Sequence, residues 1–294
     1  MPLFDDDFLP RLDYLSLVSR KAFAGQMMAR RRSRQLGSGI EFADHRQYTA
    51  GDDFRYLDWN LYARHGELLL KRFQEEQDLH VYLLLDCSSS MVVDGGVKFD
   101  LARRLTAALA YIALSDLDRI AVFAFADGVL HEFALTRGKA RIVALMDFLE
   151  QLQATGGGTS LSRLVSQFSQ RAPRPGLAVL LSDLFAPEGY QSSIDRLKYQ
   201  RFEPHVVQIH SPQEAAPGLL GDVELVDSET GEQKRMTVTE QQVQAYQKAF
   251  EAFLDELRQF CLDRAVGCSI TDTSLAYDEL VLQMLRTGGA YGLS

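Results

Sequence analysis

From residue 79 onward the chain alternates short apolar runs with longer amphipathic stretches, and this alternation is the strongest constraint on its fold. Strands are expected at 81–86, 119–126, 129–135, 177–183, 204–210 and 268–272. Helices are expected at 99–114, 140–152, 161–171, 192–200, 243–263 and 277–286. Such alternation is typical of a mostly parallel sheet with helices on both faces. The sequence therefore predicts an α/β fold built on a doubly wound, mostly parallel sheet.

Two hairpins are expected to depart from the parallel pattern. The Asp127-Gly128 pair is a strong turn signal, so the strands at 119–126 and 129–135 are expected to pair with each other. Residues 222–226 and 234–238 indicate two further strands around an acidic turn, which would form a β-hairpin insertion near 222–238. This insertion would either cover an edge of the sheet or dock a partner, and the sequence does not decide between the two.

Five oxygen-bearing residues stand at strand ends or just before an expected helix. They are Asp86, Ser88, Ser90, Thr159 and Asp183. In open α/β sheets, ligands bind beyond the carboxyl ends of the strands. Two carboxylates and three hydroxyls, with no nitrogen or sulfur ligand, suit a hard divalent cation such as Mg²⁺, with Mn²⁺ and Ca²⁺ as alternatives. A purely structural alternative is that Asp86 and Ser88 only cap the next helix.

The order Asp86-x-Ser88-x-Ser90 resembles the metal-ion-dependent adhesion site of von Willebrand factor type A domains. Thr159 and Asp183 stand where that family places its fourth and fifth ligands. The resemblance implies that the hydroxyls coordinate the ion directly or through water, and that the carboxylates often lie one layer further from it. A Glu or Asp of a partner protein would fill the sixth position. The resemblance also implies a von Willebrand factor type A-like, Rossmann-like fold.

Residues 37–76 carry a second resemblance. They include Gly51-Asp52-Asp53, Asp58-Trp59-Asn60 and Ala63-Arg64, and they lead into the strand that ends in Asp-x-Ser-x-Ser-Met. This order is similar to the signature of the bacterial "domain of unknown function 58" proteins, and the resemblance covers about residues 30–290. Relatives in that family are associated with MoxR-type AAA+ ATPases. The resemblance therefore implies a cytoplasmic adaptor that works with such an ATPase on a client protein.

Within this signature, residues 51–53 predict a turn, and residues 58–60 and 63–64 are expected to flank a short strand or loop. Arginines alternate with aspartates, at Arg46, Arg55, Arg64 and Asp44, Asp53, Asp58. The pattern is suited to a network of bidentate ion pairs. The network would either fix a small N-terminal α+β extension, residues 1–77, onto a main domain of residues 78–294, or form a partner-recognition surface.

The charge distribution argues against a general nucleic-acid surface. Acidic and basic residues balance within residues 1–77, so the net charge of −9 belongs to the remainder. One basic cluster consists of Arg30, Arg31, Arg32 and Arg34. It would either bind phosphate or an acidic partner, or form the solvated end of a helix.

The remaining composition favours a cytoplasmic protein. No apolar run reaches the ~20 residues that span a bilayer, and the N-terminus lacks a signal-peptide pattern. Three cysteines without metal-ligand spacing are expected to be small core residues in a reducing compartment; they are Cys87, Cys261 and Cys268.

Two functions of different classes follow from these observations. The sequence contains no nucleophile elbow, no His-Glu-x-x-His and no phosphate-binding loop. The favoured function is therefore a non-enzymatic, metal-dependent protein-binding adaptor. The alternative is a metal-dependent hydrolase, in which the ion polarises a phosphoryl or acyl oxygen. A hydrolase would require a catalytic group beside the metal, and the sequence shows no clear candidate.

Overall fold

The computed structural model describes residues 3–18, 36–37, 41–74, 79–154, 158–227 and 232–286. The chain divides into two compact units, one formed by Met1–Ser19 with Leu79–Ser294 and the other by Arg20–Asp78. This division differs from the expected single N-terminal unit over 1–77, because residues 1–19 cluster with the large unit. The basic cluster at 30–34 and the first two glycines of the 156–158 run lie outside the described residues.

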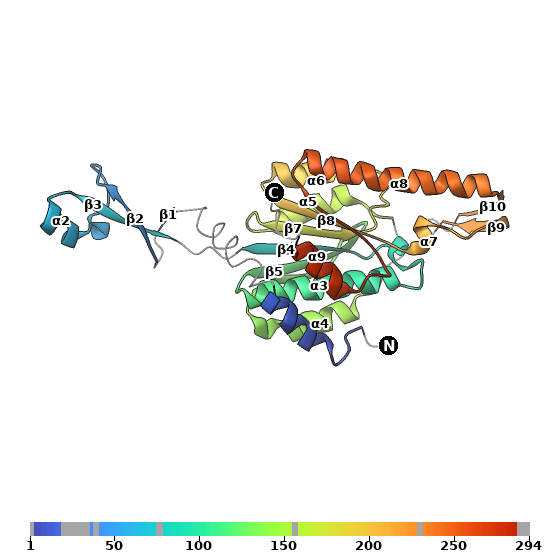
Figure 1. The fold of residues 1–294 in the computed structure, drawn as a ribbon, viewed down its shortest axis with the longest axis horizontal. Coiled ribbons are helices and arrows are strands. Elements are labelled where there is room, and N and C mark those ends of the chain that lie inside the picture. The colour runs from blue at the N-terminus through green and yellow to red at the C-terminus, as the bar shows by residue number, and fades with distance from the viewer. Residues whose placement is uncertain are drawn as a thin grey trace. The chain divides into compact units, whose positions relative to one another are not determined.

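The large unit is built on a six-stranded sheet in the order β11-β8-β7-β4-β5-β6 (Figure 1). Its strands are β4 (His80–Asp86), β5 (Arg119–Ala126), β6 (Gly128–Arg137), β7 (Leu177–Ser182), β8 (Glu203–His210) and β11 (Gly267–Asp272). The β5–β6 pair is the expected antiparallel hairpin, and the other neighbouring pairs are parallel. The structure confirms the predicted doubly wound, mostly parallel sheet. Every residue of β4 and β7 is buried, as expected for strands covered on both faces.

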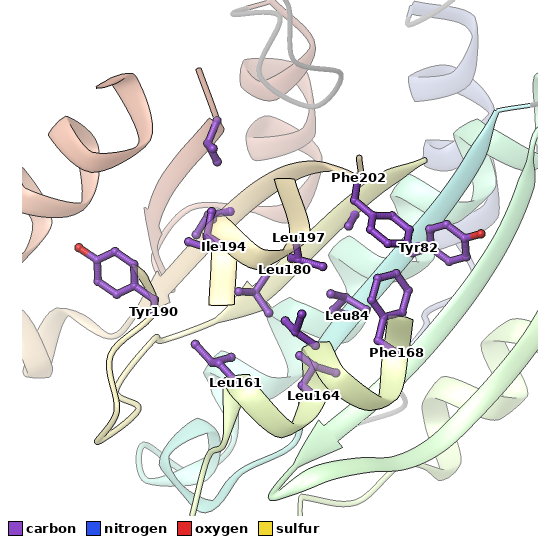
Figure 2. Close-up of a cluster of buried hydrophobic side chains, with 14 of the residues drawn as sticks. Tyr82, Leu84, Leu161, Leu164, Phe168, Leu180, Tyr190, Ile194, Leu197 and Phe202 are labelled. Atoms are coloured by element: carbon purple, nitrogen blue, oxygen red, sulfur yellow. The ribbon is translucent and has the colours of Figure 1, made fainter. Parts of the chain in front are cut away.

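One face of the sheet is covered by α5 (Leu161–Arg171), α6 (Gln191–Tyr199) and α8 (Glu240–Asp263). Figure 2 shows the apolar sides of α5 and α6 against the side chains of β4 and β7. Tyr82 and Phe168 pack edge to face at the centre of this core, with ring centroids 5.1 Å apart. Such aromatic pairs contribute about 0.5–1.5 kcal/mol beyond the area that they bury.

The opposite face is covered by α3 (Val97–Ser115), α4 (Ile142–Gln151) and α9 (Tyr277–Arg286), with the short η3 (Lys139–Arg141) leading into α4. The helical residues 8–18 pack on the same side. Phe8 contacts Tyr277 with ring centroids 5.1 Å apart, and the Tyr111 hydroxyl donates a 2.5 Å hydrogen bond to Asp13. These contacts explain why residues 1–19 belong to the large unit.

An insertion follows β8 and consists of α7 (Pro212–Ala215), β9 (Gly221–Val226) and β10 (Gln233–Val238). Strands β9 and β10 pair antiparallel as a separate two-stranded sheet, which confirms the predicted hairpin. Helix α7 was not expected, because four residues are too few to show a helical period. A capping box between Ser211 and Glu214 fixes its start.

Membrane-spanning character is absent from the helices of the described ranges. None of them combines the length and the apolar composition that crossing a bilayer requires.

The small unit is a three-stranded antiparallel sheet with short helical segments. Strands β1 (Leu36–Gly37), β2 (Glu41–Gln47) and β3 (Leu69–Gln74) are arranged in the order β1-β3-β2. Between β2 and β3 lie η1 (Phe54–Tyr56) and α2 (Trp59–His65). The short strand or loop expected between residues 58–60 and 63–64 was therefore wrong, because α2 runs through this stretch. Asp58 caps α2 by accepting bonds from two backbone N–H groups, and Gly66 ends it in the left-handed conformation.

The expected arginine–aspartate pairs form only in part. Arg55 pairs with Asp53, and both belong to the expected set; their side chains lie 2.6 Å apart. Arg46 instead bonds both carboxylate oxygens of Asp52, at 2.8 and 2.6 Å, and holds the pKa of Asp52 below its usual range. Asp58 pairs with other basic side chains, those of His45 and Lys71. The network thus fixes the turn between β2 and η1.

His205 is a fully buried titratable group in β8. Its side chain is 0% exposed, and its Nε2 lies 3.1 Å from the hydroxyl of Ser269. Burial lowers the pKa of His205 from 6.5 to about 3. Between these two values the unfolded chain binds a proton that the folded chain excludes. The part of the stability that depends on a neutral His205 is therefore fully present above pH 6.5 and falls as the pH falls below it.

Lowering the pH from 7 to 5 is expected to cost about 2 kcal/mol of unfolding free energy through His205. His205→Gln cannot gain a charge, so it should lose this part of the pH dependence. The measurement is urea denaturation at the two pH values. His131→Gln changes an exposed histidine and serves as the control, which should keep the wild-type dependence. The same pH dependence of the unfolding free energy in His205→Gln and His131→Gln would contradict the role given to His205.

Candidate metal centre

The candidate site lies at the carboxyl edge of the sheet, where β4 is flanked by β5 and β7. The chain continues from β4 to β5 on one side and later returns with β7 on the other, so the strand order changes direction at β4. Loops that diverge at such a point leave room for a ligand. The N–H of Cys87 donates a 2.7 Å hydrogen bond to the carbonyl of Phe125, which extends the β4–β5 pairing past Asp86.

Asp86, the last residue of β4, is completely buried. Its Oδ1 accepts a 2.9 Å hydrogen bond from the Ser88 N–H, and its Oδ2 accepts a 2.5 Å bond from the Ser182 hydroxyl. Burial, followed by the neighbouring Asp183 carboxylate, raises the pKa of Asp86 to about 7. Among the described residues, no cationic side chain is bonded to Asp86. A bound cation would relieve the cost of this buried carboxylate.

Ser88 and Ser90 turn their hydroxyls toward each other, with 3.0 Å between the two Oγ atoms. Both side chains are buried. Ser88 stands before the short helix η2 (Ser89–Val92), but its hydroxyl makes no capping bond there. The next α-helix starts only at Val97. The capping alternative therefore does not account for the Ser88 hydroxyl, which faces Ser90 instead.

Thr159 reaches the same edge from the loop before α5, and its side chain is buried. The next residue, Ser160, donates its N–H to the carbonyl of Ala126 at the end of β5, at 3.1 Å. Glu188, in the loop after β7, accepts bonds from the N–H and the hydroxyl of Ser162, both at 2.8 Å. Glu188 thus ties the start of α5, just after Thr159, to the loop that follows β7.

Asp183 follows the last residue of β7 and is completely buried. Its Oδ1 accepts a 3.2 Å bond from the Phe185 N–H, and its Oδ2 accepts a 3.0 Å bond from Lys98. Lys98 is also fully buried and donates to Glu214 of α7. Burial acts to lower the pKa of Lys98, but Asp183 and Glu214 outweigh it and raise that pKa. Lys98 is therefore charged at neutral pH.

The donors at this edge fit a hard divalent cation. They are all oxygens, and two buried carboxylates lie close enough for Asp183 to raise the pKa of Asp86. Mg²⁺ prefers such oxygen ligands and retains bound water. Within the described ranges, no three His, Cys, Asp or Glu side chains form a cluster that could hold a metal ion. The candidate set differs from such a cluster in composition, because three of its five members are hydroxyls.

The sequence analysis did not anticipate Lys98 or Glu214 as parts of this edge. Lys98 stands three, four and seven positions before Leu101, Ala102 and Leu105, which line the buried side of α3. A lysine on the apolar stripe of a helix is the signal that would have identified it. Glu214 carries no comparable signal, because its contact with Lys98 spans 116 residues of sequence.

Comparison with known proteins gives a family and several relatives. The family described as "Protein of unknown function DUF58" matches residues 44–254. "Uncharacterized protein Mb1516" from Mycobacterium bovis is 25% identical over 201 residues, which cover 66% of this chain and 62% of the relative. The chain thus matches less than two thirds of the length of its curated relatives.

Solved structures of other proteins are also similar to this chain. An "aerotolerance-related membrane protein" from Bacteroides fragilis is 16% identical, with a TM-score of 0.45, over 71% of this chain and 99% of that one. Proximal thread matrix protein 1 from the mussel byssus, "with zinc occupied MIDAS motif", is 13% identical, with a TM-score of 0.42, over 71% and 46% of the two chains. At these scores the similarities assign no residue role here.

Ser182→Ala is expected to lower the free energy of unfolding by about 1.5–3 kcal/mol. The Ser182 hydroxyl donates to Asp86 and accepts from the Leu184 N–H at 2.9 Å, so alanine would leave two buried polar groups short of a bond. Ser193→Ala is the matched control, since this serine is also buried and its hydroxyl has no partner among the described residues. Chemical denaturation compares the two, and equal losses would argue against the role given to Ser182.

Proposed function

We propose that this chain, which belongs to the DUF58 family of proteins of unknown function, is a non-enzymatic, metal-dependent protein-binding module. The ion would lie at the carboxyl edge of the sheet, beside the buried ends of β4 and β7. A module of this kind joins one protein to another and requires no catalytic group of its own. Its specificity depends on the partner groups that complete the metal site.

Five residues would hold the ion. Ser88, Ser90 and Thr159 would supply hydroxyl oxygens, while Asp86 and Asp183 would supply the negative charge that retains the cation. Mg²⁺ is the proposed ion, and Mn²⁺ or Ca²⁺ would be accepted because oxygen ligands bind all three. When bound, the ion supplies a positive charge at this edge. The observation that carries the proposal is the buried carboxylate of Asp86, which lies beside Asp183 and has no bonded cation among the described residues.

The partner would present a Glu or Asp side chain to the ion. The family resemblance implies a MoxR-type AAA+ ATPase as a partner, so the chain would act as an adaptor between this ATPase and a client protein. We place this activity in the cytoplasm. The three cysteines are free thiols, which supports a reducing compartment.

Ser88→Ala is expected to weaken Mn²⁺ binding about tenfold or more, because it removes an oxygen from the proposed ligand set. Isothermal titration calorimetry with Mn²⁺ measures the change. Ser89→Ala is the matched control, because this serine lies in the same turn but outside the proposed ligand set. Equal Mn²⁺ affinity in the wild type and in Ser88→Ala would refute the site.

The adaptor role is tested with a purified MoxR-type ATPase from the same organism. In Mg²⁺ the wild type is expected to co-elute with the ATPase from a gel-filtration column, and a chelator should separate them. Asp86→Ala should not co-elute, whereas Ser193→Ala should. Co-elution that persists in the chelator and with Asp86→Ala would refute the metal-dependent adaptor role. Metal-dependent turnover of a phosphoryl or acyl substrate, lost in Asp86→Ala, would favour a hydrolase instead.

A further inference from the structure

Lys98 is a fully buried lysine beside the candidate metal centre, in the first turn of α3. An ammonium so far from water requires charged partners. Its Nζ lies 3.0 Å from Asp183 Oδ2 and also contacts Glu214 Oε1. The ring of Phe185 lies against the ammonium, with its centroid 5.8 Å away. Lys98 is therefore held by the end of β7, by the loop that follows it and by α7.

Glu214 is fixed independently of Lys98. Its Oε2 accepts a 2.8 Å bond from the Ser211 N–H, and its own N–H donates to the Ser211 hydroxyl at 3.3 Å. These two bonds form the capping box that starts α7. With Oε2 bound in this way, Oε1 is directed at Lys98. The ammonium is thus held by two carboxylates from different elements, so its position does not depend on Asp183 alone.

Both oxygens of Asp183 are already engaged. Oδ2 accepts from Lys98, and Oδ1 accepts from the Phe185 N–H. Asp86 is different, because its partners are a hydroxyl and a backbone N–H, with no ammonium among them. The two carboxylates of the candidate site are therefore unequal. Asp183 shares its charge with Lys98, whereas the bonds that Asp86 accepts come from neutral groups.

The charged side chains around Lys98 determine how it would affect a bound metal ion. Asp183 and Glu214 share the Lys98 ammonium, whereas Asp86 accepts its bonds from Ser182 and the Ser88 N–H. The Lys98 charge would repel a cation bound here, and Asp183 Oδ2 would have to give up its bond from Lys98 to reach that cation. An ion coordinated mainly by hydroxyls and water keeps more of its charge than an ion bound by several carboxylates. It therefore attracts an external carboxylate more strongly.

We propose that Lys98 is a positioning residue, which holds Asp183 out of direct contact with the ion and so reserves the ion's charge for the carboxylate of a partner protein. This inference rests on the proposed function. Lys98 would thus control the preference of the site for an acidic partner without being one of the metal ligands. Lys98 lowers the affinity of the site for the metal alone and raises its affinity for an acidic side chain once the metal is bound.

Lys98→Met tests the inference with Mn²⁺ as the probe. Calorimetry is expected to show Mn²⁺ binding about tenfold tighter than in the wild type, because a nearby positive charge has gone and Asp183 is released toward the ion. Water-proton relaxation should fall in the Mn²⁺-loaded variant, because Asp183 replaces a bound water. Acetate, a simple carboxylate, should then bind the loaded variant more weakly. Lost packing alone would weaken Mn²⁺ binding rather than tighten it.

Glu214→Gln provides a test of the opposite sign. It removes one carboxylate and leaves the pair of Lys98 and Asp183 in place, so Mn²⁺ binding should weaken by roughly threefold. The double variant Lys98→Met/Asp183→Asn should lose the gain seen in Lys98→Met. Glu214→Gln keeps the buried pair of Lys98 and Asp183. It therefore tests how the charges at this edge affect Mn²⁺ affinity even where Lys98→Met fails to fold.

Two results would overturn the inference: a folded Lys98→Met that binds Mn²⁺ no more tightly than the wild type, or a Glu214→Gln that binds it more tightly. Neither would affect the proposed function as long as Ser88→Ala still loses Mn²⁺. If Ser88→Ala binds Mn²⁺ as the wild type does, the proposed function itself fails. The two failures are therefore distinguishable in one set of titrations.

Discussion

The burial of strands β4 and β7 is the constraint on which the candidate site depends. Both strands are buried along their whole length, so the carboxylates at their ends, Asp86 and Asp183, emerge where water is already excluded. In that setting a carboxylate requires hydrogen bonds or a cation. Asp86 is bonded by Ser182 and the Ser88 N–H, and Asp183 is bonded by Lys98. The packing that stabilises the sheet therefore also brings the polar groups of this edge together.

Most of the fold was predictable from the sequence because hydrophobic periodicity reports burial. The strand at 119–126 and the helix at 161–171 have their predicted bounds, and the helix at 277–286 begins where it was predicted. The two short helices α2 and α7 were not predicted. Each is shorter than the window over which a period can be recognised, and caps at Asp58 and Ser211 start them.

The candidate site was predictable only where its residues follow strand ends. Spacing identified Asp86 and Asp183 because parallel strands bring their carboxyl ends to one edge. The contact of Lys98 with Glu214 joins residues 116 positions apart, and no local pattern encodes it. The same limit applies in the small unit. Regular spacing suggested other aspartates for Arg46, but the turn after β2 brings Asp52 to it.

The order of the two units along the chain has a mechanical consequence. Residues 3–18 belong to the large unit, so Arg20–Asp78 form an insertion that is covalently joined to that unit at both ends. A force applied to the small unit is therefore shared between two attachments, the helical residues 8–18 and the start of β4. At the first attachment, packed contacts such as that of Phe8 with Tyr277 resist the force. At the second, the pairing of β4 with β5 and β7 resists it. Whatever grips the small unit consequently pulls on the same strand that ends in Asp86.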